Sequence, residues 1–351
     1  MSDTRIKVAL IGYGHIGKRH AQVINESTDF TLVALIDPHH MERPDSLFTS
    51  VSFFNELGDF IAHNNELPAE QKAQLAIIAT PNGLHQAQIN ICLDNGLDVV
   101  AEKPMVLNSQ ALKELQQKAI QKGLNLFPVV QNRYAKISQW LHSVLKQEAL
   151  GKIYIIQINC LWNRDERYYQ KGSWHGDITL DGGSLYTQFL HFIDMLYWLF
   201  GKPAVKSTDL FDFNHQELSS FEDSGMIQFA FNQGMAKDVL ATMTFSTAAW
   251  SKNVESSLTI LAEKGSIKIG GQYMEKLLYA SGSQLPEEDA LQAMLMQDPE
   301  KEKYGAAAGH YTFYTQLAQY FKGGPCDLPT TDQAREVIEI IEQAYHNRAI
   351  K

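Results

Sequence analysis

Cysteine, positive charge and long apolar runs are all scarce in this sequence. Its 351 residues include three cysteines, Cys92, Cys160 and Cys326, and no two of them form a CxxC pair. This wide spacing indicates neither a disulfide framework nor a zinc site. Unpaired cysteines are typical of a reducing compartment, which is where we expect the protein to act.

Negative charge outweighs positive charge. The chain has 30 lysines and arginines against 40 aspartates and glutamates, so its formal net charge is −10. An acidic surface argues against nucleic acid as the main partner and does not favour anionic membranes. A small anionic substrate stays compatible with this composition, because a local basic pocket can override the net charge.

No apolar run is long enough to span a bilayer. The longest, FLHFIDMLYWLF at 189–200, also carries His191 and Asp194, whereas a spanning helix needs about 20 apolar residues. The first residues, MSDTRIK, lack the apolar core of a signal peptide. We therefore expect a cytoplasmic, soluble protein without a membrane partner.

Short apolar runs alternate with helical patterns over the first 130 residues. Strands are predicted at 7–12, 31–37, 74–81, 97–104 and 124–131, and helices at 15–27 and 109–123. Strands that are apolar throughout are typical of a parallel sheet covered by helices on both faces. The pattern therefore predicts an α/β domain of the dinucleotide-binding type over residues 1–130.

Apolar residues alternate with period two beyond about residue 150. Strands are predicted at 152–162, 225–231, 239–247 and 258–270, and helices at about 183–200, at about 308–322 and after a capping box at Thr330 and Gln333. The pattern predicts a second, α+β domain over 131–351, with a large open, mainly antiparallel sheet. The last helix places Val337, Ile341 and Ala344 on one stripe, and it is a candidate to pack back on the first domain.

The stretch GYGHIG at 12–17 joins the first predicted strand to the first predicted helix. In such a turn Gly12 allows the tight bend, Gly14 lets a pyrophosphate approach the backbone, and Gly17 lets the helix pack on the strand. The N–H groups near His15 and Ile16 are then free to bind phosphates. We interpret the stretch as a phosphate-binding turn, the alternative being a glycine-rich turn without a nucleotide.

Asp37 ends the second predicted strand and lies twenty residues beyond Gly17. Its carboxylate can accept hydrogen bonds from the adenosine ribose and would repel a 2′-phosphate. No arginine follows it immediately. The sequence therefore predicts NAD rather than NADP as the cofactor.

Polar groups follow two of the predicted strands, in ATPNGLH (79–85) and AEKP (101–104). Ligands of an open parallel sheet bind beyond the carboxyl ends of its strands. Lys103 lies at such an end, and the proline after it favours extended geometry. Its amine is a candidate to take or share the alcohol proton during hydride transfer. A solvated surface lysine is the alternative.

In the second domain, Thr187, His191 and Asp194 have the spacing of one helix face. Histidine titrates nearest to neutral pH, so His191 is a candidate acid, base or hydroxyl-orienting group. A core histidine bonded to a neighbour is the alternative. No cluster of ligating residues accompanies this face in the sequence, so we expect no metal.

A polar and aromatic loop, WNRDERYYQKGSWHGD, covers 162–177. Arg164 can bind a carboxylate or phosphate in bidentate fashion. Tyr168, Tyr169 and Trp174 offer flat faces for a sugar or nicotinamide ring. The alternative is a surface loop with packed aromatic side chains.

Four motifs in this order resemble the Gfo/Idh/MocA family, the glucose–fructose oxidoreductase and inositol dehydrogenase group, over nearly the whole chain. They are GYGHIG with Asp37, ATPNGLH, AEKP, and DGG (181–183) with HFID (191–194). The resemblance implies a Rossmann domain, an α+β domain, and a homodimer or homotetramer. It also implies that Lys103 is catalytic and that His191 faces the oxidised carbon. It further assigns cofactor contacts to Thr80, Pro81, Asn82, His85, Glu102 and Gln131.

The chain departs from the family pattern at one position. Many members hold an aspartate four residues before the histidine, where this chain has Thr187, followed by Gln188. Members that act on nucleotide sugars also depart here, commonly with an amide. The stretches FFNELGDFIAHNN, QNRY (131–134) and W-N-R…YY…W (162–174) are similar to UDP-N-acetylglucosaminuronate 3-dehydrogenases of surface-polysaccharide pathways.

The resemblance implies an NAD-dependent dehydrogenase that passes the C3 hydride of a UDP-N-acetyl-hexosaminuronate to C4 of NAD⁺. Lys103 or His191 would take or relay the hydroxyl proton, and Arg164 would hold the uronate carboxylate. The implied substrate site comprises Lys103, Arg164, Tyr168, Tyr169, Trp174, Thr187, Gln188 and His191. The alternatives are a dehydrogenase of a free sugar, inositol or sugar phosphate, and a regulator that binds NAD and a sugar without catalysis.

Overall fold

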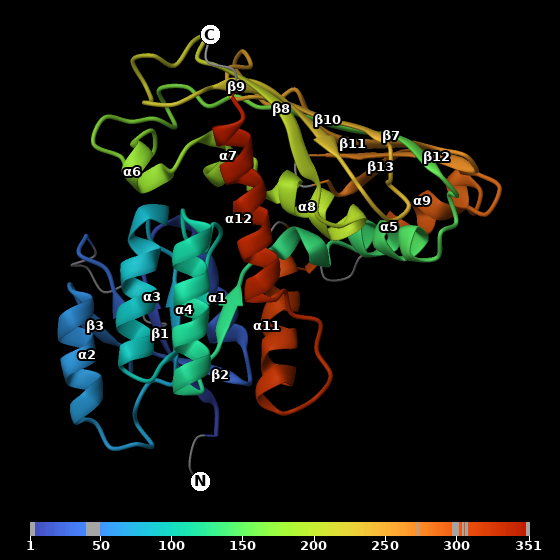
Figure 1. Ribbon diagram of the computed structural model, residues 1–351. Coiled ribbons are helices and arrows are strands. Elements are labelled where there is room, and N and C mark those ends of the chain that lie inside the picture. Colours follow the sequence, from blue (N-terminus) through green and yellow to red (C-terminus); the bar gives the residue numbers. More distant parts are fainter. Residues whose placement is uncertain are drawn as a thin grey trace. The chain divides into compact units, whose positions relative to one another are not determined.

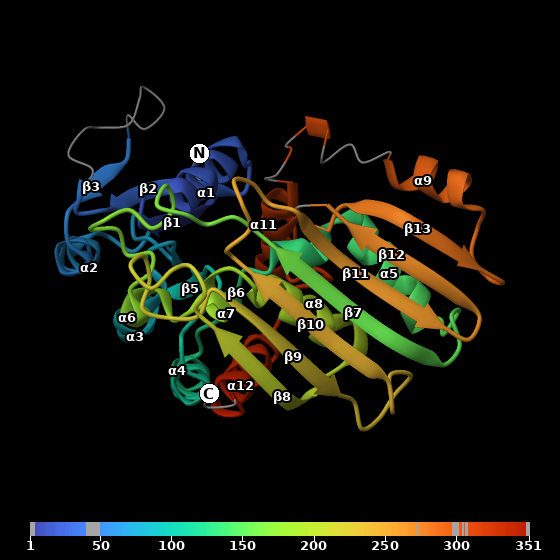
Figure 2. The same cartoon turned by 90° about the horizontal axis from the view of Figure 1, so that it is seen from above.

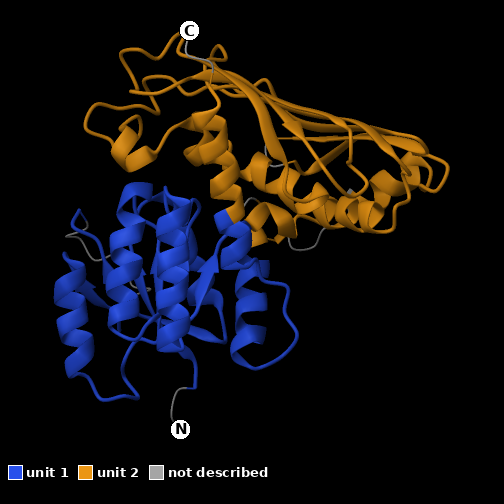
Figure 3. Cartoon of the chain, viewed as in Figure 1, with its two compact units in different colours: residues 1–130, 310–335 blue, residues 131–309, 336–351 orange. Residues whose placement is uncertain are grey.

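The computed structural model describes residues 4–39, 50–271, 274–296, 302–303, 305 and 308–348. The chain forms two compact units, shown in two colours in Figure 3. Unit 1 comprises residues 1–130 and 310–335, and unit 2 comprises residues 131–309 and 336–351. Residues 310–335 thus group with the first 130 residues.

Unit 1 contains a six-stranded parallel sheet in the order β3-β2-β1-β4-β5-β6. Its strands are Ile6–Ile11 (β1), Phe30–Ile36 (β2), Ser52–Phe54 (β3), Leu75–Ile78 (β4), Asp98–Ala101 (β5) and Leu126–Pro128 (β6). Strand β4 is buried at every position, as expected of a strand covered on both faces. This strand order is that of a Rossmann sheet, so the predicted fold of the first domain is confirmed.

Helices cover both faces of this sheet. Figures 1 and 2 show α1 on one face and α3 and α4 on the other. The helices are His15–Glu26 (α1), Leu57–Glu66 (α2), His85–Asp94 (α3), Ser109–Lys122 (α4) and most of Ala308–Phe321 (α11). Helix α4 ends at Gly123, whose positive φ of 66° suits the glycine predicted there.

Unit 2 contains a seven-stranded open sheet in the order β13-β12-β11-β7-β10-β9-β8 (Figure 2). Its strands are Ile153–Leu161 (β7), Ala204–Phe211 (β8), Ser224–Ala230 (β9), Leu240–Ser246 (β10), Glu255–Ala262 (β11), Gly265–Gly270 (β12) and Lys276–Gly282 (β13). Strands β7 and β10 pair in parallel, and the other neighbours pair antiparallel. The predicted open, mainly antiparallel sheet is confirmed.

Helices α5 and α8 lie against one face of this sheet (Figures 1 and 2). The helices of unit 2 are Lys136–Lys146 (α5), Ile178–Asp181 (α6), Ser184–Thr187 (α7), Leu190–Phe200 (α8) and Glu288–Met296 (α9), and Thr331–His346 (α12) runs into it from unit 1. The predicted capping box opens α12: the Thr330 hydroxyl accepts from the Gln333 N–H, and the Gln333 side chain accepts from the Thr330 N–H.

Two sequence predictions are wrong in detail. The segment 258–270, predicted as one strand, is a hairpin of β11 and β12 that turns at Glu263 and Lys264. Burial alternates on both sides of the turn, so periodicity alone did not reveal it. The helix predicted over about 183–200 is two helices, α7 and α8, separated at Gln188 and Phe189. Phe189 is fully buried there, against Trp162 and Phe245.

Among the described residues, we find no helix with the length and apolar character needed to cross a membrane. All three cysteines are free: Cys92 and Cys160 are buried, and Cys326 is exposed.

Candidate functional site

The three glycines of the 12–17 turn have different surroundings. Gly12 has a φ of 93°, and a Cβ there would lie 2.6 Å from the carbonyl oxygen of Ala79. A Cβ at Gly17 would collide with the carbonyl oxygen of Gly12, so α1 can pack this closely only without a side chain there. A Cβ at Gly14 would have no heavy atom within 4 Å. The backbone at Gly14 is thus open to a ligand.

The first turn of α1 is suited to an anion. Gly14 is the N-cap residue, no side chain caps the helix, and the first turn contains no acidic residue. The N–H groups of a helix start are orphan donors, and the helix dipole favours negative charge beside them. The residues present therefore fit the pyrophosphate of a dinucleotide.

Asp37 is fixed next to this turn. Its Oδ2 accepts from the N–H of Tyr13 at 2.7 Å, and its Oδ1 accepts from the N–H of His39 at 2.8 Å. These bonds hold the carboxylate at the end of β2, where a ribose hydroxyl could donate to its remaining lone pairs.

The loop after β4 is tied to the segment that follows Lys103. The ring of His85 is fully buried, with Nδ1 2.9 Å from the carbonyl oxygen of Pro104 and Nε2 2.9 Å from that of Thr80. Burial lowers the pKa of His85 and outweighs these backbone hydrogen bonds. Thr80 donates to Gln88 at 2.6 Å. His85 therefore connects the loop after β4 to the segment that follows Lys103.

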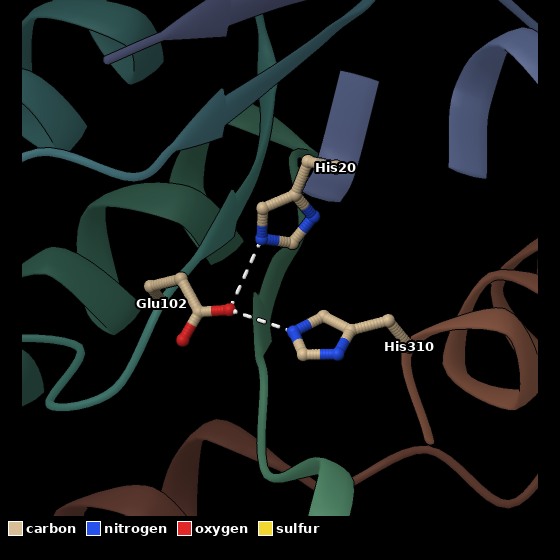
Figure 4. Close-up of side chains that lie close together, drawn as sticks. All are labelled: His20, Glu102 and His310. Carbon is tan, nitrogen blue, oxygen red and sulfur yellow. Dashed lines mark hydrogen bonds and ion pairs between the residues drawn. The ribbon is translucent and has the colours of Figure 1, made fainter. Parts of the chain in front are cut away.

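Lys103 is half-buried at the carboxyl end of β5, and its peptide bond to Pro104 is cis. Its N–H donates to Oε2 of Glu102 at 3.2 Å. The Glu102 side chain points into unit 1, where its Oε1 lies 3.0 Å from Nε2 of His20 and 3.2 Å from Nε2 of His310 (Figure 4). Neither histidine could be identified from the sequence, because both are far from Glu102 along the chain.

In unit 2, Arg164, Tyr168 and Gln188 come together. The Nε of Arg164 donates to Oε1 of Gln188 at 2.7 Å, and Nε2 of Gln188 donates to the Tyr168 hydroxyl at 2.6 Å. The guanidinium also lies 4.7 Å from the ring centroid of Trp162 and 5.2 Å from that of Tyr168. These contacts fix a half-buried cation on the loop that was proposed to hold an anionic group.

Two of the other aromatic residues of this loop differ in exposure. Trp174 is half-buried and packs on His175, with 3.9 Å between ring centroids, and His175 stacks on Tyr168. Tyr169 is buried and packs edge-on against His215. Burial raises the pKa of both Tyr168 and Tyr169, and the charge of Asp181 raises it further, so both phenols are neutral at physiological pH.

Asp181 supplies a carboxylate next to Thr187. The Thr187 hydroxyl donates to the carboxylate of Asp181 and, at 2.9 Å, to its main-chain oxygen. The same carboxylate is almost fully buried and accepts from the N–H of Gly176 at 3.0 Å. The position where many family members have an aspartate thus holds a hydroxyl bonded to one.

His191 is half-buried in the first turn of α8. The predicted single helix face of Thr187, His191 and Asp194 is wrong, because the helix is interrupted between the first two. Asp194 is buried and receives two hydrogen bonds from Arg133, at 2.6 and 2.9 Å. Gln131, in the neighbouring 3₁₀ turn Gln131–Tyr134, has a buried Oε1 without a hydrogen-bond partner among the described residues.

Two family models cover most of the chain. The Gfo/Idh/MocA model described as "Oxidoreductase family, NAD-binding Rossmann fold" matches residues 6–129. The companion model, "Oxidoreductase family, C-terminal alpha/beta domain", matches residues 142–349.

Solved structures and a curated relative are similar over nearly the whole length. The WlbA dehydrogenase of Bordetella pertussis, in complex with NADH and UDP-GlcNAcA, has a TM-score of 0.85 at 24% identity, covering 99% of this chain and 96% of that one. The WlbA dehydrogenase of Thermus thermophilus, with NAD and UDP-GlcNAcA, has a TM-score of 0.70 at 21% identity, covering 97% and 94%. The scyllo-inositol 2-dehydrogenase (NADP⁺) IolW of Bacillus subtilis is 23% identical, covering 97% of this chain and 93% of the relative.

Proposed function

The chain belongs to the Gfo/Idh/MocA oxidoreductase family and is an NAD-dependent dehydrogenase, and we propose that it oxidises the C3 hydroxyl of a UDP-N-acetyl-hexosaminuronate. The proposed substrate class rests on the guanidinium of Arg164, whose Nε donates to the side chain of Gln188. Gln188 lies three residues before His191 in the chain. A fixed guanidinium suits the carboxylate of a uronate. The proposal is supported by the whole-length likeness to WlbA structures that contain UDP-GlcNAcA.

We propose the following roles for the chain's residues. The N–H groups at the start of α1 bind the pyrophosphate, and Asp37 binds the adenosine ribose. The bound NAD⁺ supplies a hydride acceptor. As the substrate carbon loses its hydride, the amine of Lys103 takes the hydroxyl proton, and His191 orients that hydroxyl. The products are the keto-sugar, NADH and the proton.

A substrate panel tests the proposed substrate. Purified protein with NAD⁺ is offered UDP-N-acetylglucosaminuronate, UDP-N-acetylglucosamine, scyllo-inositol, a free hexose and a hexose phosphate, and the absorbance of NADH is recorded. We expect the highest kcat/KM with the uronate. We also expect Arg164→Met to raise KM for the uronate about 10- to 100-fold, the loss of one charge-assisted hydrogen-bonding partner. The KM for UDP-N-acetylglucosamine, which has the diphosphate but no uronate carboxylate, should stay nearly unchanged. A preference for inositol, which the likeness to IolW favours, would contradict the proposal.

Lys103→Ala tests the proton-transfer role. Loss of a general base lowers turnover by roughly 10²- to 10⁴-fold, while the affinity for NADH, measured by fluorescence titration, should change little. Lys113→Ala is the matched control, because Lys113 is exposed on α4. Full activity of the Lys103→Ala enzyme would refute the role. If wild-type protein binds NAD⁺ but shows no reduction in a single turnover, the protein is a non-catalytic regulator.

The open sheet of unit 2 is the surface we propose for a homodimer or homotetramer. One of its faces exposes apolar side chains: Met226, Leu240, Leu261 and Tyr279 are 38–51% exposed. The strand register places them on the same face, and exposed apolar patches often mark interfaces. Size-exclusion chromatography with light scattering gives the number of copies directly.

A further inference from the structure

Three buried side chains from distant parts of unit 1 meet next to the backbone of Lys103. We propose that this buried cluster of His20, Glu102 and His310 positions Lys103, and through it the amine that handles the substrate proton. The inference rests on the proposed function of Lys103. It makes the two histidines positioning residues of the reaction rather than catalytic ones.

The carboxylate of Glu102 connects two kinds of partner through its two oxygens. Oε1 lies 3.0 Å from Nε2 of His20 on α1 and 3.2 Å from Nε2 of His310 on α11 (Figure 4). Oε2 accepts the N–H of Lys103 at 3.2 Å. His20 is itself held, because its Nδ1 lies 2.9 Å from the Tyr314 hydroxyl. Both imidazoles are fully buried. A displacement of the carboxylate would therefore move the backbone N–H of Lys103 with it.

The surroundings of Glu102 favour its anionic form. Burial alone would raise the pKa of Glu102, but the hydrogen bonds from His20 and His310, together with their Coulombic interaction with the carboxylate, outweigh burial and hold that pKa well below its usual range. Burial lowers the pKa of His310 despite the neighbouring carboxylate. A buried charge without donors is costly, so each histidine that donates to Glu102 keeps the carboxylate in place.

The cluster also joins the two functional segments of unit 1. His20 lies on α1, whose first turn is the proposed pyrophosphate site, and Glu102 directly precedes Lys103 in the chain. A direct side-chain connection between them therefore points to alignment of the cofactor helix with the lysine.

Two histidines and a carboxylate within 4.8 Å of one another could also hold a metal ion. Both Nε2 atoms, however, lie at hydrogen-bond distance from the same carboxylate oxygen. Elemental analysis of the purified protein distinguishes the two arrangements. We expect less than 0.1 metal ion per chain, and a stoichiometric metal ion would overturn the hydrogen-bonded cluster.

The functional test compares His310→Met with His310→Gln. Glutamine can place an amide N–H near the position of the imidazole Nε2–H, whereas methionine fills the space without a donor. Because misplacing a reacting group by about 1 Å can cost about 100-fold, we expect His310→Met to lower kcat about 10- to 100-fold. The Kd for NADH and the KM for the sugar should stay within about threefold, and His310→Gln should recover most of kcat. His63→Met, at an exposed histidine on α2, is the control.

A double-mutant cycle of His310→Met with Lys103→Ala tests whether the loss of kcat in His310→Met arises through Lys103. If the cluster acts through Lys103, His310→Met should cost less than about twofold in the Lys103→Ala background. An undiminished kcat in His310→Met, or the same loss in both backgrounds, would overturn the inference. Full activity of Lys103→Ala alone would instead refute the proposed function. If His310→Met does not fold, Tyr314→Phe, which removes only the hydroxyl that holds His20, replaces it, with an expected loss of three- to tenfold in kcat.

Discussion

Gly14→Ala and Gly17→Ala should separate cofactor binding from folding. The two glycines lie in the same turn, but an added methyl group meets different surroundings at each. At Gly14 the methyl group would face open space, and the backbone there, with φ −69°, is accessible to alanine. At Gly17 it would collide with the carbonyl oxygen of Gly12. The first change should affect the bound pyrophosphate, and the second should affect the folded protein itself.

The magnitudes follow from these contacts. Overpacking against backbone costs roughly 1–3 kcal/mol, so Gly17→Ala should lower Tm without cofactor by several degrees. Gly14→Ala should cost at most about 1 kcal/mol, the scale of an N-cap change. Blocking the pyrophosphate from the backbone N–H groups removes charge-assisted hydrogen bonds of about 1.5–3 kcal/mol, which weakens NAD binding about 10- to 150-fold.

Thermal shift with NAD measures both effects. At a NAD concentration of 100 Kd the wild-type protein gains about 2.7 kcal/mol, or roughly 5–11 °C in Tm. The same concentration gives a 100-fold weaker Gly14→Ala variant only about 0.4 kcal/mol. If Gly14→Ala retains the full NAD-induced shift, the pyrophosphate does not lie against this turn. If it unfolds as readily as Gly17→Ala without NAD, the open surroundings assigned to Gly14 are wrong.

Two further predictions concern the cofactor and pH. Asp37→Ser should lower the ratio of kcat/KM for NAD over NADP at least tenfold, because the repulsion of a 2′-phosphate is lost; an unchanged ratio would place the ribose elsewhere. Burial lowers the folded-state pKa of His310, so below about pH 6.5 the unfolded chain binds a proton that the folded chain does not, and stability falls as pH decreases. The lowered pKa of Glu102 adds a loss only below about pH 4.5. Urea unfolding between pH 7 and 5 should therefore show a shallower loss for His310→Gln, by up to about 1.4 kcal/mol per pH unit, and equal slopes would contradict a neutral buried His310.

Local sequence patterns were sufficient to predict most helices and strands, but not every break between them. The strand, the glycine turn and the helix over residues 6–26 form as predicted, because apolar runs and glycines act over a few residues. The capping box at Thr330 is formed for the same reason. The break between α7 and α8 was missed because the apolar pattern continues through it, and the packing of Phe189 against two other elements interrupts the helix.

The candidate site was predictable only where its residues are neighbours in sequence. GYGHIG predicts the glycine turn, and AEKP predicts the place of Lys103 at a strand end. Both can be read from the sequence because the residues of each motif are consecutive in the chain. The side chains that contact the Glu102 carboxylate come from α1 and α11, and no spacing rule links residue 20 or 310 to residue 102. Arg133 and Asp194 form a buried ion pair over sixty residues apart for the same reason. Long-range polar contacts of this kind are set by the tertiary fold, which periodicity does not encode.

The difference between neighbours in sequence and neighbours in space also explains the position where the chain departs from the family pattern. In sequence, Thr187 in place of an aspartate is the argument for the regulator, because many family members hold a carboxylate at this position, four residues before the histidine. In space, Asp181 restores a carboxylate one hydrogen bond away, bonded to the Thr187 hydroxyl. A buried carboxylate that accepts from a hydroxyl fixes the direction in which that hydroxyl's lone pairs point. The Thr187 hydroxyl therefore presents its lone pairs in a defined orientation.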